Sequence, residues 1–353
     1  MIDLGPEQLG LLAALSSARG VSGAEGAVRD LILTALSGLD VNTRVDPMGN
    51  LLVTGINEGQ GGARVLVAAH MDEVGMMLTS GNGEGIFRFA AVGGLRAVNL
   101  VGQAVAVGEQ GFPGVIGCGP VHLVKGKKRR QPGSIDDLRI DVGPEIGERV
   151  KVGDYAVFRT QFFRQGEALF GKAFDDRLGA AILVELIKHP PRGVELTAAF
   201  TVQEEVGLRG AKVAAHALDP DVAFALDTTP ARDFPPLVGD EEAIHYNAHL
   251  DQGPVIYAAD GATISDTRLV SHLVSTALKA GLPHQIRQPG GGGTDAGAMF
   301  RAREGIPSVS VSVPTRYLHT AVSQARISDW AATVNLMIQA LDTLPGGLLE
   351  GMP

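Results

Sequence analysis

Cysteine is almost absent from this chain of 353 residues, in which Cys118 is the single example. One thiol can form neither an intramolecular disulfide framework nor a zinc site built from cysteines, so both are excluded. We expect Cys118 to pack as a small buried hydrophobic residue. The scarcity of thiols also fits a protein of the reducing cytoplasm.

Long hydrophobic runs are missing as well. No stretch reaches the roughly 18 apolar residues that a membrane-spanning helix requires. The N-terminal segment has a short apolar centre, but Asp3 and Glu7 stand where a signal peptide carries basic residues. Pro6 is better placed as the first residue of an amphipathic helix. We therefore expect a cytoplasmic protein with no membrane partner.

An excess of positive charge is the third absence. The net charge is −9, without a basic or acidic tail. This balance argues against nucleic acid as the main partner. The one basic run, KGKKRR at residues 125–130, is followed by QPGS, and we interpret it as a solvated loop.

Apolar residues make up 45% of the chain, which is enough for a substantial core. Apolar spacing predicts helices at residues 6–18 and 24–37, and VNTRVDPMGNLLVTG is typical of a β-hairpin. A buried strand is expected at residues 64–69. After Gly171 strands and helices alternate, with helices expected at residues 176–188, 207–216, 265–280 and 328–344 and strands at 195–203, 222–226 and 308–313. This alternation predicts an α/β fold with a mixed sheet sandwiched by helices.

Residues 75–163 have a different texture, with short valine-rich runs broken by glycine and proline. This pattern predicts a small all-β module. Because the strand–helix alternation resumes afterwards, we predict a catalytic α/β domain formed by residues 1–74 and 164–353. The β-rich domain of residues 75–163 would be inserted into it.

Acidic residues and histidines gather where predicted strands end. His70 follows VLVAA, Glu204 and Glu205 follow AAFTV, and Asp227 follows AFAL. In open α/β sheets, ligands bind beyond the carboxyl ends of the strands. Carboxylates and imidazoles without thiolates suit Zn²⁺, Co²⁺ or Mn²⁺, and Asp72 is placed to accept the second N–H of His70. Five such ligands, one of them shared, are enough for two ions about 3.5–4 Å apart.

The order of these motifs resembles the dinuclear-metal aminopeptidases, and most closely the deblocking or glutamyl aminopeptidases that form tetrahedral (TET) particles. The resemblance runs through RGVSGAEGAVRD, DPMGNLLV, AAHMDEVG, GKAFDDRLG, EEVGLRGA, ALDTTP, GGGTDAGA and PTRYLHT. It implies a zinc-peptidase-like catalytic domain and an enzyme that removes N-terminal residues from short peptides. It also implies a homo-oligomer built from dimers, with the tetrahedral dodecamer favoured over the dimer and the β insertion pairing the subunits.

The same resemblance implies a role for each motif residue. Asp175 would bridge two divalent ions, Zn²⁺ or Co²⁺ with Mn²⁺ as a further candidate, and the Asp175–Asp176 peptide bond would be cis. His70 and Asp227 would complete one metal site, and Glu205 and His319 the other. Glu204 would be the general base toward a water molecule activated by both ions, and Asp72 would assist catalysis through His70.

Three further residues are expected near the substrate. The segment PGGGGTDAGAMF lacks the spacing of a phosphate-binding loop, and its resemblance to the GGTDA segment of the family places Thr294 and Asp295 at the cleft. Arg316 either contacts substrate or forms a structural salt bridge.

Other functions stay open at this stage. A related dinuclear carboxypeptidase or N-acyl amino-acid deacylase would use similar ligands, although the LRGA motif and the small β insertion favour the aminopeptidase. A catalytically inactive assembly subunit is the alternative from another class, but no ligand position is lost. Glycoside hydrolysis needs only two carboxyl groups and would leave the histidines without a role.

Overall fold

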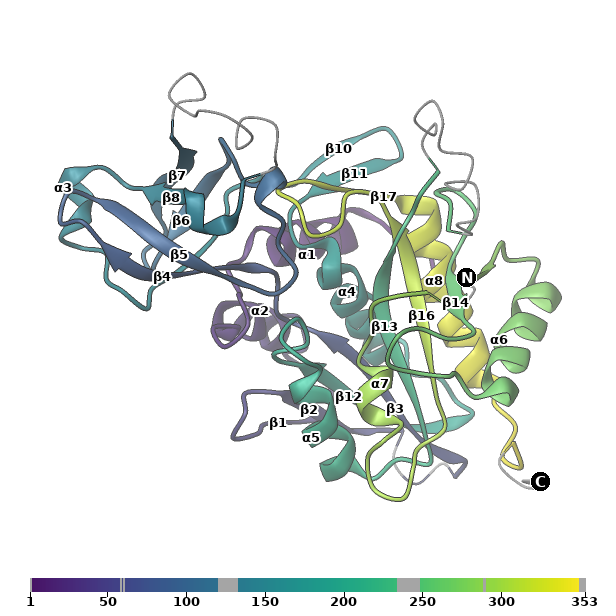
Figure 1. Ribbon diagram of the computed structural model, residues 1–353. Helices are drawn as coiled ribbons and strands as arrows, with labels where there is room; N and C mark the ends of the chain where they lie inside the picture. The colour runs from purple at the N-terminus through teal and green to yellow at the C-terminus, as the bar shows by residue number, and fades with distance from the viewer. Residues whose placement is uncertain are drawn as a thin grey trace.

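The computed structural model describes residues 2–57, 59, 61–119, 133–233, 248–287 and 290–348. The basic run at residues 125–130 lies outside the described residues. The described chain forms an eight-stranded sheet flanked by helices, a closed barrel at one side of it, and a three-stranded sheet (Figure 1). Among the described residues, no helix combines the length and the apolar character needed to cross a bilayer.

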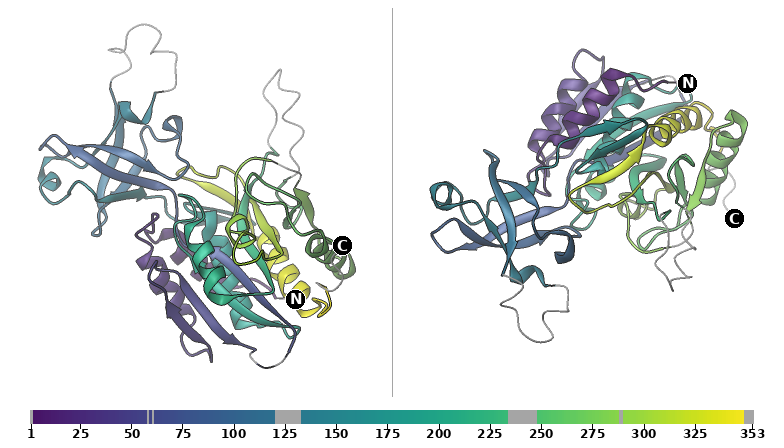
Figure 2. Two further views of the ribbon diagram at one scale, coloured as in Figure 1. Left: turned by 60° about the horizontal axis from the view of Figure 1, so that its bottom comes forward. Right: turned by 90° about the horizontal axis from the view of Figure 1, so that it is seen from above.

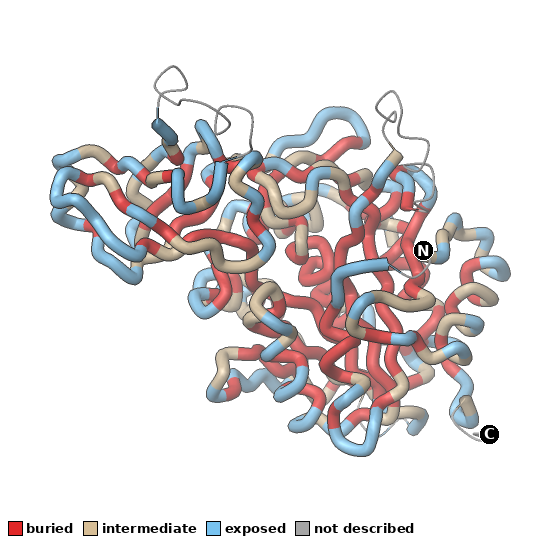
Figure 3. The backbone as a smooth tube through the Cα atoms, in the orientation of Figure 1, coloured by how far each residue is buried: buried red, intermediate tan, exposed pale blue. Residues whose placement is uncertain are grey.

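The eight-stranded sheet is mixed, and its centre is parallel. Its strand order is β1 (Asn42–Val45), β2 (Leu51–Ile56), β12 (Val194–Thr201), β3 (Ala63–His70), β13 (Val222–Pro230), β16 (Ser308–Thr315), β14 (Val255–Tyr257) and β15 (Gln285–Arg287). Strands β12, β3, β13 and β16 run parallel to one another. They are buried on both faces, as their almost continuous apolar sequences require. Figure 3 shows this buried centre in red.

Helices cover both faces of the sheet (Figure 2). One face packs against α1 (Pro6–Ser17), α2 (Gly26–Ala35), α4 (Phe174–Lys188), α6 (Thr267–Ala280) and α8 (Ile327–Asp342). The other face is rich in alanine and packs against α5 (Arg209–Leu218) and α7 (Ala296–Met299). Successive residues of β3 alternate between these two cores, as the period of a strand dictates. The predicted fold class, a mixed sheet sandwiched by helices, is confirmed.

The barrel follows β3 directly. Its strand order is β4 (Gly75–Gly81), β5 (Ile86–Val92), β8 (Leu138–Asp141), β7 (Phe112–Cys118), β6 (Ala104–Val107) and β9 (Tyr155–Phe158). Alternate residues such as Met76 and Leu78 point into its core. Within the described residues, closure of the barrel leaves none of its six strands at an open edge. The division of the chain into residues 1–74 with 164–353 and residues 75–163 stays a prediction.

Some local expectations differ from the structure. Cys118 is exposed, not buried, because it is the last residue of β7 and lies where the strand leaves the barrel. The barrel segment also holds short helical turns, namely η1 (Ala97–Asn99), η4 (Ile135–Asp137) and α3 (Pro144–Gly147). The helix expected at residues 207–216 begins two residues later, at Arg209.

A small sheet connects the barrel back to the main sheet. It contains β10 (Phe163–Gln165), β11 (Ala168–Gly171) and β17 (Ser323–Arg326). Strand β11 leads into the loop before α4, and β17 leads into α8. The loop from β16 to β17, which contains His319, is thereby held close to the start of α4.

Candidate metal centre

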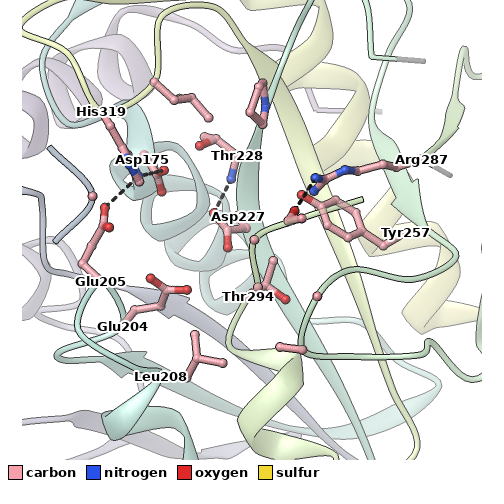
Figure 4. Close-up of a pocket in the computed structure, with 18 of the residues that line it drawn as sticks. Asp175, Glu204, Glu205, Leu208, Asp227, Thr228, Tyr257, Arg287, Thr294 and His319 are labelled. Carbon is pink, nitrogen blue, oxygen red and sulfur yellow. Dashed lines mark hydrogen bonds and ion pairs between the residues drawn. The ribbon is translucent and has the colours of Figure 1, made fainter. Parts of the chain in front are cut away.

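The parallel strands bring the predicted side chains to one edge of the sheet. Thr201, the last residue of β12, pairs with His70, the last residue of β3, so Glu204 and Glu205 follow immediately beside His70. Asp227 lies near the end of β13, where it pairs with Ser312 of β16. Asp175 stands at the start of α4, and His319 lies in the loop after β16. Figure 4 shows these carboxylates and His319 converging on one cavity.

The side chains form two groups with the geometry of metal ligands. His70, Glu204 and Asp227 form one group, and the other contains Asp175, Glu205 and His319. Within each group, the candidate ligand atoms lie within 4.8 Å of one another. All six residues predicted to be metal ligands or the general base are therefore brought together.

Asp175, a member of the second group, also faces the first. Its Oδ1 is 3.0 Å from Nε2 of His70, and its Oδ2 is 3.3 Å from Nε2 of His319. Each oxygen of this carboxylate thus faces a histidine of a different group. The peptide bond that joins Asp175 to Asp176 is cis, as predicted.

His70 is held on both sides of its ring. Its Nδ1 lies 3.0 Å from the backbone oxygen of Asp72 and 3.5 Å from the Asp72 carboxylate, while its Nε2 faces Asp175. Asp72, the predicted partner of His70, is therefore in contact with the ring, although its backbone carbonyl lies closer to Nδ1 than its carboxylate does. The backbone N–H of His70 donates to Oδ2 of Asp176 at 3.2 Å. These contacts fix the ring orientation and leave one nitrogen for the site.

The carboxylate of Asp72 organises the paired glutamates. Its Oδ1 accepts a hydrogen bond from the backbone N–H of Glu204 at 3.0 Å, and its Oδ2 accepts one from that of Glu205 at 3.2 Å. The hydroxyl of Ser22 donates to the same Oδ2 at 2.6 Å. One buried carboxylate thus orders the turn that aims Glu204 and Glu205 at different groups.

His319 is held in place by two backbone features. Its φ of 56° lies in the left-handed region, which a residue with a side chain adopts only when the surroundings require it. Gly94 approaches the ring so closely that a Cβ there would lie 2.7 Å from Nδ1. A side chain at position 94 would therefore push His319 out of the site.

The electrostatics of the cluster favour a cation between the carboxylates. Burial and neighbouring carboxylates raise the pKa values of Glu204 and Asp227 well above their usual range. Burial lowers the pKa of His319, but hydrogen bonds to Asp175 and Glu205 outweigh that effect and raise it to about 11. Burial raises the pKa of Asp175, but hydrogen bonds from His319 and His70 bring it below its usual value. The site thus places carboxylates close together and stabilises positive charge among them, so the residues present fit divalent metal ions.

The cavity over these groups has a volume of about 630 Å³. Thr294, one of the residues predicted to contact substrate, lies in its wall. Asp295 is buried and accepts a hydrogen bond from Thr201, and burial raises its pKa to about 6. Arg316 pairs with Asp233 at 2.6 Å and is not part of the wall. Of its two predicted roles, this arrangement corresponds to the structural salt bridge and not to substrate contact.

Arg287 and Tyr257 are among the residues of the cavity wall that sequence reasoning missed. The guanidinium of Arg287 stacks over the ring of Tyr257, with Cζ 4.5 Å from the ring centroid. It also donates to the backbone oxygen of Gly291 at 2.9 Å. Figure 4 shows Arg287 and Tyr257 at one side of the cavity and His319 with Glu205 at the other. Because both residues lie on short strands near the sheet edge, no motif in the sequence marked them.

Comparisons with known proteins place the chain in one family. Residues 49–336 match the M42 glutamyl aminopeptidase family. The chain is 33% identical to a glutamyl aminopeptidase from Lactococcus lactis, over 90% of this chain and 91% of the relative. It is 31% identical to a lysyl aminopeptidase from Pyrococcus furiosus, over 95% of this chain and 96% of the relative.

A solved structure supports the same assignment. The TET1 peptidase of Pyrococcus horikoshii, described as assembling into a tetrahedron or a large octahedral shell, superposes with a TM-score of 0.81 at 36% identity. The match covers 96% of this chain and all of the other. The chain therefore belongs to the M42 glutamyl aminopeptidase family, and it is a metal-dependent peptidase.

Proposed function

We propose that the enzyme removes N-terminal residues from short peptides, using two divalent ions held by five of the six converging side chains. His70 and Asp227 would hold one ion, Glu205 and His319 the other, and Asp175 would contribute one carboxylate oxygen to each. When bound, the ions would supply Lewis-acid polarisation of the scissile carbonyl and a lowered pKa for the attacking water. The donor set favours Zn²⁺ or Co²⁺, with Mn²⁺ as a further candidate.

Glu204 is the proposed general base. It is mostly buried, with 9% of its surface exposed, and its Oε2 lies 3.9 Å from Nε2 of His70. Asp175 can be the third ligand beside His70 and Asp227 as well as beside Glu205 and His319. Glu204 is then not needed as a ligand and can exchange a proton. Its carboxylate would accept a proton from the attacking water and later return it to the leaving amine.

The observation that carries this proposal is the position of Asp175 between His70 and His319. The experiment is hydrolysis of a panel of aminoacyl-nitroanilides and N-acyl amino acids by the chelated and the metal-restored protein. Aminoacyl substrates should be cleaved only after Zn²⁺ or Co²⁺ is restored. Cleavage restricted to N-acyl amino acids would replace the proposal with a deacylase.

The cavity wall supports a preference for acidic first residues. One relative is named a glutamyl aminopeptidase and another a lysyl aminopeptidase, so family membership alone does not decide which first residue the enzyme prefers. The described residues contain no carboxylate within ion-pair distance of the Arg287 guanidinium, which Tyr257 and Gly291 hold in place. A substrate carboxylate is the ligand that a fixed guanidinium binds best, through two parallel hydrogen bonds.

We also propose that the chain assembles into a homo-oligomer, with the tetrahedral dodecamer as the favoured state and the β-rich domain of residues 75–163 as a pairing element. The assembly described for the P. horikoshii relative supports this proposal. Sedimentation-velocity analysis should give a particle of twelve chains. A monomer at micromolar concentration would refute the assembly, while leaving the catalytic proposal intact.

A further inference from the structure

A buried cluster of opposite charges lies behind the metal-binding groups. The carboxylate of Glu73 accepts hydrogen bonds from Nζ of Lys172 at 2.6 and 2.8 Å and lies 3.4 Å from Nη2 of Arg177. All three side chains are at most 2% exposed. Glu73 also accepts the backbone N–H of Gly20 at 3.1 Å. We call Glu73, Lys172 and Arg177 the charge clamp.

The clamp joins the two segments that carry the central ligands. Glu73 follows His70 and Asp72 in the crossing from β3 to the barrel, where its backbone pairs with Val21. Lys172 and Arg177 stand on either side of Asp175, in the loop and first turn of α4. A single carboxylate therefore ties both ends of the Asp175 segment to the His70 segment.

The clamp also reaches the end of α1. Nζ of Lys172 donates to the backbone oxygen of Ala18 at 2.7 Å, and Nη1 of Arg177 donates to that of Leu15 at 2.5 Å. Most donors of the two cations thus have partners, although Nε of Arg177 has no hydrogen-bond partner in the described part of the chain. Three segments distant in sequence meet at Glu73.

We propose that Glu73 is a positioning residue for the metal pair, acting through Lys172 and Arg177 to set the place of Asp175 relative to His70. Groups behind metal ligands typically affect metal affinity by about 10–100-fold. Apolar residues of similar volume can often replace a buried ion pair without loss of stability. Stability alone therefore does not require charged residues at this point. The position of both cations beside the central ligand is what a positioning role requires.

This inference rests on the proposed metal pair, so the experiment measures metal binding directly. The full-length protein is stripped by chelation and titrated with Co²⁺, and the visible absorption of bound Co²⁺ reports affinity and coordination geometry. Glu73→Gln keeps the side-chain shape and removes the charge. We expect a 10- to 100-fold weaker affinity for at least one ion and an altered Co²⁺ spectrum.

A matched control separates positioning from general destabilisation. Asp329 is 1% exposed, and its carboxylate accepts the backbone N–H groups of Asp251 and Gly253. Asp329→Asn alters a buried carboxyl outside the metal-binding groups, so it should shift the thermal midpoint but leave Co²⁺ affinity within about threefold of the parent. Should Glu73→Gln fail to fold, Lys172→Met is judged by the same criterion.

Two outcomes would overturn the inference. Folded Glu73→Gln or Lys172→Met with parental Co²⁺ affinity and spectrum would reduce the clamp to a structural element. An equal loss of affinity in Asp329→Asn would show that the loss is not specific to the clamp. If the parent itself binds no Co²⁺, the proposed metal pair fails, which is distinguishable from failure of the clamp alone.

Discussion

Glu204 and Glu205 are adjacent in sequence, yet their carboxylates face different histidines. Oε2 of Glu204 lies 3.9 Å from Nε2 of His70, whereas Oε1 of Glu205 lies 3.2 Å from Nε2 of His319. The hydrogen bonds from both backbone N–H groups to Asp72 make this divergence possible. The two neighbouring acids can therefore have separate roles, Glu205 as a metal ligand and Glu204 as the general base.

This division predicts that Glu204→Gln keeps its metal and loses turnover. Without a carboxylate to accept the proton, kcat should fall by about 10²–10⁴-fold. Glu195→Gln, at the opposite end of β12, is the matched control and should retain parental kcat. A Glu204→Gln enzyme with near-parental turnover, measured with metal content, would remove Glu204 from the role of base.

The neighbouring substitution should behave differently. Glu205→Gln removes a charged ligand from the group that contains His319, so the second ion should bind at least about tenfold more weakly. Elemental analysis after dialysis against dilute Zn²⁺ should find close to one ion per chain in place of two. Retention of both ions by this variant would show that Glu205 is not a ligand.

The strand-end motifs made much of this architecture predictable. His70, Glu204 and Asp227 follow apolar runs that form parallel strands, and parallel strands end at one edge. The cis bond at Asp175 followed from family resemblance, and it is present. The pairing of His70 with Asp72 was also predicted from sequence. The contact between Arg287 and Tyr257 was beyond prediction, because it arises from tertiary packing between short strands.

The charge clamp illustrates the same limit. Glu73 lies in the recognisable stretch AAHMDEVG, but its partners are about a hundred positions away, at Lys172 and Arg177. A charged residue next to a metal motif is indistinguishable in sequence from a solvated one. Only the folded chain shows that all three side chains are buried together.

Substrate preference should change with Arg287. Loss of a charge-assisted hydrogen bond is worth about 1.5–3 kcal/mol, so Arg287→Met should lower kcat/KM for glutamyl-nitroanilide by about 10–100-fold. Leucyl-nitroanilide should change by less than about threefold. Nitroanilides have no C-terminal carboxylate, so the loss would identify the side chain of the first residue as the group that Arg287 binds.

Arg96 provides the control for this experiment. It also lines the cavity but is exposed, and among the described residues it has no aromatic or backbone contact of the kind that holds Arg287. Arg96→Met should therefore have the smaller effect on glutamyl-nitroanilide. An equal loss for glutamyl and leucyl substrates in Arg287→Met would refute the acidic preference while leaving the aminopeptidase assignment in place.

Stability should depend on pH through Asp329. Burial raises the pKa of Asp329 to about 6, from an ordinary value of 3.8. Between about pH 4 and pH 6, the native carboxyl holds a proton that the unfolded chain has released. The free energy of unfolding therefore falls as the pH rises through this window, by about 2–3 kcal/mol for this group.

The variant Asp329→Asn has no such titration, so the parent should lose stability relative to it between pH 4 and pH 6. Urea denaturation of both proteins at several pH values measures this difference. A difference that stays constant across the window, or one of opposite sign, would show that Asp329 is ionised in the folded protein throughout.

Metal stoichiometry tests the central claim most directly. The claim is that Asp175 joins two ligand groups, so chelated protein titrated with Zn²⁺ in a calorimeter should bind two ions per chain. Asp175→Ala should bind them far more weakly while remaining folded by circular dichroism. A parent protein that binds no ion, or an Asp175→Ala variant that binds two as tightly as the parent, would contradict the account.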